Sequence, residues 1–173
     1  CVPMFILLCG CAREHQKPTK PLSHQGIEAA AVLGRFLSPT AWNEARRASL
    51  IQSIVPLEYH GATAFAKTLI HAKFEIPENS LQALLSDAEA GSTSFESDSD
   101  PGHAFGPDSH HTWDSDGSGA PRVLSWWQPG TTARKRNYFW ASNLDNKPVT
   151  RIWLQAAERD HGSRLVYVRI EIE

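Results

Sequence analysis

Cysteine is scarce in this sequence and confined to one end of it. The three cysteines are Cys1, Cys9 and Cys11, so the rest of the chain has no disulfide framework, no thiol nucleophile and no cysteine ligand for zinc. Long apolar runs are missing too, because no stretch approaches the roughly 20 apolar residues that a transmembrane helix needs. The formal net charge is only -2, and the lack of a basic excess argues against a nucleic-acid partner.

The sequence also lacks the common catalytic motifs. It contains no Gly-x-Ser-x-Gly of a serine hydrolase and no glycine-rich phosphate-binding loop. We therefore expect a non-enzymatic binding or accessory module rather than an enzyme, and we predict no cofactor. The 173 residues fit a single domain that is large enough to bury an apolar core.

The chain begins with a short apolar run that ends in a cysteine motif. Residues 2–8 carry no charge, residues 8–11 read Leu-Cys-Gly-Cys, and the sequence turns polar soon after Cys11. This arrangement resembles the lipobox of bacterial lipoproteins. The resemblance implies that Cys11 is lipidated and anchors the chain in a bacterial membrane, facing the periplasm or the outside. The alternatives are an apolar terminus that belongs to the fold and a metal site at Cys9 and Cys11.

The lipobox resemblance divides the chain into three parts. We expect residues 1–10 to be a truncated lipoprotein signal peptide, residues 11–21 to be a polar tether and residues 22–173 to be one domain. Attachment is firm when more than one acyl chain is present. At that location the membrane itself, an envelope protein or a glycan are the partners that we expect.

Apolar spacing in the body of the chain predicts an α+β fold. Period-two alternation is clearest near the end, where Val166, Val168 and Ile170 share one face and polar residues share the other. His71 alternates onto the polar face of its own strand, so we expect it to be exposed. The pattern predicts an antiparallel sheet of four to five strands, with one or two helices on one face and water on the other.

The boundaries of these elements follow from caps, breakers and spacing. Helices are expected at residues 25–36 and 77–89, and strands at 65–76, 137–142, 150–157 and 164–172. Residues 49–59 form either a strand in which Pro56 marks an edge or a bulge, or the end of a helix over 41–54. A turn is expected at 60–63, and a long polar loop rich in Ser, Asp, Gly and Pro at 92–121.

The polar loop holds the residues that would bind a metal. Within residues 98–116, histidines and carboxylates gather in a spacing that matches no established ligand pattern, and the candidates are His103, His110, His111, Asp114 and Asp116. The stretch 114–119 also resembles the start of an EF-hand calcium loop, although its twelfth position is Ser125 instead of an acid. One interpretation is a metal-dependent enzyme or metal-binding protein, and the other is a solvated acidic loop.

Two adjacent tryptophans are the other candidate binding residues. Trp126 and Trp127 lie in an apolar segment that ends at a turn. Adjacent residues of a strand face opposite sides, so one ring can enter the core while the other offers a surface to a glycan, peptide or protein. The alternative is that both rings pack beneath the long loop.

Four segments carry a second resemblance. They are residues 73–77 (Lys-Phe-Glu-Ile-Pro), 81–85 (Leu-Gln-Ala-Leu-Leu), 126–129 (Trp-Trp-Gln-Pro) and 166–168 (Val-Tyr-Val). Together they resemble segments of small bacterial lipoproteins that have no established activity. This resemblance implies export and a sheet with a short helix, and it implies no catalytic residue.

Overall fold

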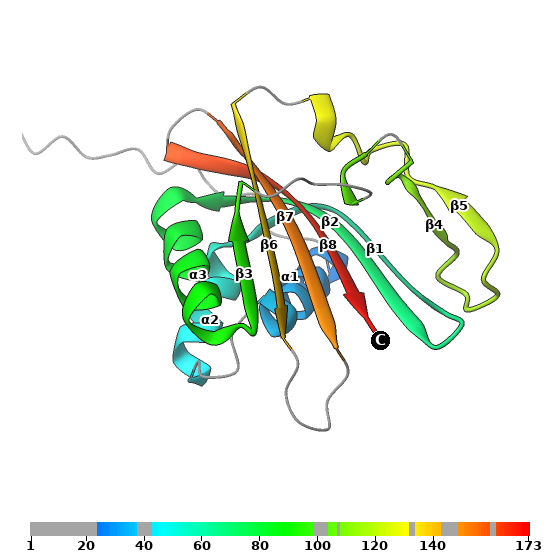
Figure 1. The fold of residues 1–173 in the computed structure, drawn as a ribbon, viewed down its shortest axis with the longest axis horizontal. Helices are drawn as coiled ribbons and strands as arrows, with labels where there is room; N and C mark the ends of the chain where they lie inside the picture. The colour runs from blue at the N-terminus through cyan, green and yellow to red at the C-terminus, as the bar shows by residue number, and fades with distance from the viewer. Residues whose placement is uncertain are drawn as a thin grey trace, which may run out of the picture.

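The computed structural model describes residues 24–37, 43–98, 104–106, 108–131, 134–142, 149–159 and 162–173. Cys11, the expected signal peptide and tether, and His103 therefore lie outside the described residues. Within these ranges the chain forms three helices, a six-stranded antiparallel sheet and a two-stranded ribbon (Figure 1). The α+β class is confirmed, whereas the sheet is larger than the four to five strands that were predicted.

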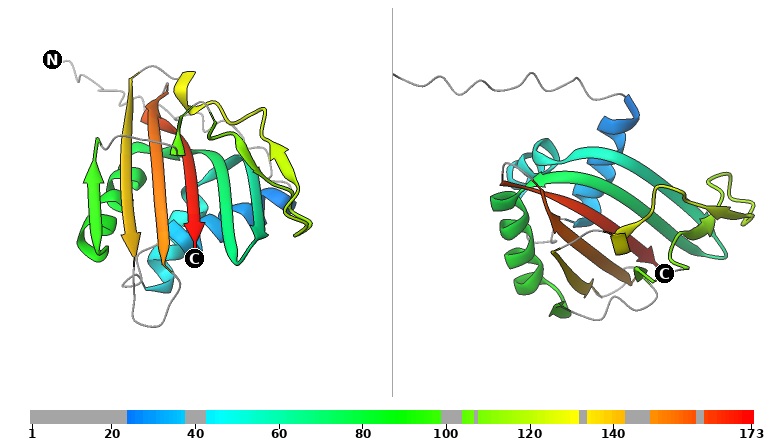
Figure 2. Two further views of the ribbon diagram at one scale, coloured as in Figure 1. Left: turned by 45° about the vertical axis from the view of Figure 1, so that its right-hand side comes forward. Right: turned by 90° about the horizontal axis from the view of Figure 1, so that it is seen from above.

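The helices are α1 (His24–Leu37), α2 (Glu44–Ser53) and α3 (Glu78–Gly91), with a short 3₁₀ turn at Pro129–Thr131. The large sheet contains β1 (Val55–Ala64), β2 (Lys67–Pro77), β3 (Ser94–Ser97), β6 (Lys135–Ser142), β7 (Thr150–Glu158) and β8 (Ser163–Ile172). The ribbon consists of β4 (His111–Trp113) and β5 (Pro121–Val123). The strand order of the large sheet is β1-β2-β8-β7-β6-β3, so the C-terminal strand lies at its centre (Figure 2).

Residues 43–64 contain both predicted elements, a helix followed by a strand. The helix is correct, because α2 begins after Asn43, whose side chain accepts a hydrogen bond from the Arg46 amide at 2.9 Å. Pro56 then lies in edge strand β1, next to a register shift between residues 56 and 58. The predicted turn at residues 60–63 is wrong. These residues pair with β2, and the chain reverses only at Phe65 and Ala66, which both have positive φ.

The main core lies between the inner face of the sheet and the three helices (Figures 1 and 2). The inner face presents Phe74 from β2, Leu154 from β7 and the predicted apolar side of β8, all fully buried. Helix α3 contributes the stripe that its spacing predicts, Leu81, Leu84, Leu85 and Ala88. Burial of each such aliphatic or aromatic side chain stabilises the fold by about 1.5 to 3 kcal/mol.

The outer face of the sheet is only partly in water, which corrects the predicted single wet face. The segment 104–131 folds over it and buries a second apolar cluster, which consists of Ala104, Phe105, Leu124, Trp127, Leu165 and Tyr167. His71 points to this face and is 0% exposed, so the predicted exposure of His71 is wrong. Alternation placed the side chain on the correct face, but it does not show that a distant segment covers that face. No helix in the described ranges is both long and apolar enough to cross a membrane.

Candidate functional site

Three polar side chains form a row across the outer face of the sheet. In the strand register His60 of β1 lies opposite His71 of β2, and His71 lies opposite Arg169 of β8. Directly opposed residues of antiparallel strands share a face and contact each other. The row therefore places two imidazoles and a guanidinium beneath segment 104–131. His60 fixes the ribbon to the sheet, because its Nε2 donates a hydrogen bond of 2.7 Å to the Trp113 carbonyl.

His71 is a neutral side chain at the centre of this row. Burial, together with the nearby charge of Arg169 and the neighbouring His60, lowers its pKa to about 3, against a smaller opposite effect of the Ser109 backbone. Neither ring nitrogen forms a well-aligned hydrogen bond with a described residue. The edge of the ring meets Trp127, with ring centroids 4.7 Å apart. His71 therefore acts as a packed, uncharged support and not as a base open to solvent.

Trp127 holds segment 104–131 on the sheet. The ring is 3% exposed and meets Tyr167 of β8 edge to face, with centroids 5.5 Å apart. Its Nε1 donates to the Ser109 hydroxyl at 3.0 Å, and that hydroxyl donates to the Gly106 carbonyl at 2.7 Å. Trp126 is only partly buried and packs against the same cluster. One ring is thus a structural anchor, and the binding of a partner by these rings stays a prediction.

A pocket of about 460 Å³ opens between the β4–β5 ribbon and strands β2 and β8. Leu69 and Trp113 supply apolar walls, while its polar lining includes Lys67, Thr112, Arg169 and Glu171. We call this the ribbon pocket. Its volume falls in the range of about 300 to 1,000 Å³ that is typical of small-molecule sites.

Two buried polar atoms of the lining have no partner among the described residues. The Thr112 hydroxyl forms no hydrogen bond although the residue is only 6% exposed, and Arg169 Nε is likewise unpaired. Another nitrogen of the same guanidinium donates to Glu171 at 2.8 Å, which fixes the orientation of the fork. Native proteins rarely leave buried polar groups unsatisfied, and exceptions call for an explanation. Both residues line the ribbon pocket, so a hydroxyl and an N–H group without a partner lie in its wall.

The charge of the lining indicates the kind of ligand. Lys67 and Arg169 are cationic and Glu171 is anionic, which leaves one positive charge in excess. Lys67 also pairs with Glu173 at 2.7 Å, and Glu173 in turn pairs with Arg151 at 3.0 Å, so the excess of one positive charge remains. A single excess charge next to apolar walls suits a molecule with one anionic group and an apolar body.

The predicted metal ligands do not come together in the described part of the chain. Asp114 forms an ion pair of 2.9 Å with Arg122, and Asp116 accepts a hydrogen bond of 2.8 Å from the Ser118 amide. The rings of His110 and His111 lie against each other, with centroids 4.3 Å apart. No three His, Cys, Asp or Glu side chains gather closely enough in these ranges to hold a metal ion.

The calcium-like stretch has a conformational explanation. It forms the turn between β4 and β5, in which Gly117 and Gly119 have φ of 79° and 73°. Glycine adopts positive φ without steric cost, and aspartate commonly bonds to the backbone of its own turn. The turn chemistry of a hairpin thus accounts for the Asp-x-Asp-Gly-x-Gly pattern.

Sequence reasoning missed Thr112 and the role of Arg169. Arg169 belongs to the polar side of the predicted alternation in β8, which is the outer face, whereas the ribbon above it falls within the predicted long loop. Strands of three residues carry too little alternation to be identified. The sequence of β8 does indicate that both faces of the sheet are covered at this point. Residues 165–168 are apolar without interruption, and all four are buried.

No protein-family model, curated protein or solved structure matches this chain.

Proposed function

We propose that the protein is a binding module of the bacterial envelope, anchored through a lipid on Cys11, whose ribbon pocket takes a small amphipathic carboxylate. The pocket with its unpartnered Thr112 hydroxyl and Arg169 Nε is the observation that carries the ligand proposal. The terminal cysteine motif supports the anchor. A tethered binding module of this kind needs no catalytic residue.

The lining gives each part of such a ligand a counterpart. We expect a carboxylate that enters between the ribbon and the sheet to accept hydrogen bonds from the Arg169 fork and from the Thr112 hydroxyl, both of which can donate. The apolar body lies against Trp113 and Leu69. Glu171 already occupies one side of the guanidinium, so it excludes a second negative group. These features favour monocarboxylates over dicarboxylates.

The ligand proposal is tested by calorimetric titration with phenylacetate. Phenylacetamide and phenethylamine serve as neutral and cationic molecules of similar shape, and we expect only phenylacetate to bind. In Thr112→Val, which keeps the shape and removes the hydroxyl, affinity falls by about threefold to tenfold. Its free energy of unfolding does not fall, because the hydroxyl has no partner.

Thr93→Val is the matched control, since the Thr93 hydroxyl bonds to the Ala141 carbonyl at the β3 edge of the sheet. This variant should bind phenylacetate like the wild type. Equal binding of the three molecules, or equal affinity in Thr112→Val, would contradict the proposed ligand class. Failure of all three to bind would exclude an aromatic monocarboxylate.

The anchor is tested separately in a bacterial host. The full precursor and its Cys11→Ser variant are labelled with palmitate, with and without globomycin. We expect label in the wild type that is lost in the variant and reduced by the inhibitor. Equal label, or none in either protein, would remove the envelope part of the proposal and leave the ribbon pocket unaffected.

A further inference from the structure

A second pocket of about 460 Å³ lies at the start of α3, beside the first residues of β6, the end of β7 and the start of β8. It shares no lining residue with the ribbon pocket. Its charged lining residues are Glu78, Arg134, Lys135, Arg136, Glu158 and Arg164. We call it the basic pocket.

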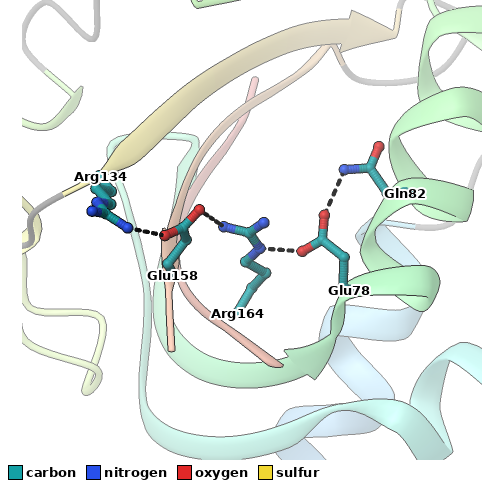
Figure 3. Close-up of polar contacts among 5 residues, drawn as sticks. All are labelled: Glu78, Gln82, Arg134, Glu158 and Arg164. Atoms are coloured by element: carbon teal, nitrogen blue, oxygen red, sulfur yellow. Dashed lines mark hydrogen bonds and ion pairs between the residues drawn. The ribbon is translucent and has the colours of Figure 1, made fainter. Parts of the chain in front are cut away.

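An alternating chain of charges crosses this pocket (Figure 3). Arg134 pairs with Glu158 at 3.4 Å, and the other oxygen of Glu158 pairs with Arg164 at 3.4 Å. The Nε of Arg164 donates to Glu78, which the Gln82 amide also contacts at 2.9 Å. The chain joins the segment before β6 to both strands of the terminal hairpin and to the first turn of α3.

The two carboxylates of this chain are already in use. Glu78 and Glu158 each bind two partners, one at each carboxylate oxygen. The hydrogen bond from Arg164 lowers the pKa of Glu78, so that carboxyl is ionised at neutral pH. Each carboxylate oxygen of Glu78 and Glu158 therefore already has a partner.

The cations outnumber the acids. Lys135 is engaged in a contact of its own, and the three arginines of the lining exceed its two carboxylates by one positive charge. The Arg136 side chain is exposed and forms no hydrogen bond or ion pair with any described residue, and its charge contributes to the lowered pKa of Glu78. The N-terminus of α3 adds partial positive charge, since Pro77 before it supplies no side-chain cap. The Arg136 guanidinium beside a helix N-terminus matches the negative charge and the acceptor oxygens of a phosphate group.

We propose that the basic pocket binds a phosphate monoester, with Arg136 as its principal contact. At neutral pH a phosphate monoester carries nearly two negative charges and presents three acceptor oxygens. Guanidinium groups bind such oxygens in pairs. Arg136 donates from β6, while Arg134 and Arg164 remain tied to Glu158 and complete the positive rim. This chemistry is shared by soluble phosphate esters and by lipid headgroups that end in phosphate.

The test uses glycerol 3-phosphate as the soluble probe and phosphatidylcholine vesicles with or without phosphatidic acid as the membrane probe. Binding is followed by calorimetry and by vesicle sedimentation at constant ionic strength. We expect Arg136→Gln to weaken binding of at least one probe by tenfold or more, about 1.4 kcal/mol. Arg122→Gln is the matched control, because it removes the same charge from an exposed pair on the ribbon.

The outcomes separate the two sources of phosphate. An Arg136-dependent affinity for glycerol 3-phosphate supports the proposal with a soluble ester as ligand. Arg136-dependent sedimentation with phosphatidic acid alone supports it with a lipid headgroup as ligand. Equal losses in Arg136→Gln and Arg122→Gln, or no binding of either probe, would overturn it. Urea unfolding midpoints of the two variants verify that both are folded.

Discussion

The buried imidazole of His71 makes a specific prediction for the pH dependence of stability. The unfolded chain binds a proton at this side chain near pH 6.5, whereas the folded chain does so only near a pKa of about 3. Between these values the unfolded state holds more protons, so acid favours unfolding. Below about pH 3 both states are protonated, and this contribution changes no further.

The expected size follows from the same two values. Each pH unit in this window is worth about 1.4 kcal/mol of differential stability. Acidification from pH 6.5 to about pH 4 therefore removes about 3 kcal/mol from the free energy of unfolding. This is a large part of the total stability of a typical domain, which is about 5 to 15 kcal/mol. The wild type should unfold at clearly lower urea concentration at the acidic end.

Substitution of His71 by Leu tests the reasoning. Leucine is similar in size to histidine, can pack against Trp127 and removes the two buried ring nitrogens. Urea unfolding at several pH values between about 4 and 6 should show a slope that is flatter than in the wild type by about 1.4 kcal/mol per pH unit. His111→Leu is the matched control, because water reaches the exposed His111 ring in the folded and the unfolded chain alike. Equal slopes in the wild type and His71→Leu would refute the argument.

Three further substitutions test the fold around the sites by urea unfolding. Trp127→Ala empties the second cluster and should lower the free energy of unfolding by about 3 to 5 kcal/mol, whereas Trp126→Ala, at a partly exposed residue, should lower it much less. Equal losses would contradict the role of Trp127 as anchor. Asn43→Ala removes the cap of α2 and should cost about 1 kcal/mol, so an unchanged midpoint would argue against the cap. Gly119→Ala forces a side chain into positive φ and towards Phe65, and should cost more than Gly162→Ala, which shares the φ of 73° but has open space around it.

Much of the fold could be predicted because its elements carry their own pattern. The spacing of apolar residues identified α3, and alternation identified β8, in each case from local sequence alone. The sixth strand, β3, could not be found in this way. Its four residues are mostly polar and exposed, and they pair with β6 through backbone hydrogen bonds that any side chain allows. The size of the sheet was therefore underestimated.

The site could be predicted only in part, since its residues meet through long-range packing. Arg169 was placed on the correct face, but Thr112 comes from a ribbon whose two strands have three residues each. The histidines and aspartates of the same stretch attracted a metal hypothesis, although Asp114 and Asp116 bond to neighbours of the ribbon and its turn. Residue types suggested a ligand set, whereas turn geometry and ion pairs explain these aspartates.

Burial on both faces explains why the ribbon pocket lies where it does. Strands β2 and β8 each contain four successive buried residues, and at these positions helices cover one face and segment 104–131 covers the other. Towards Lys67 and Glu171 this double coverage ends, and the ribbon stands over the sheet without filling the space beneath it. Trp127 fixes the segment at its packed end and His60 fixes the ribbon near the pocket. A ligand that bridged Thr112 and Arg169 would complete the packing between the two layers, so we expect binding to stabilise the ribbon against the sheet.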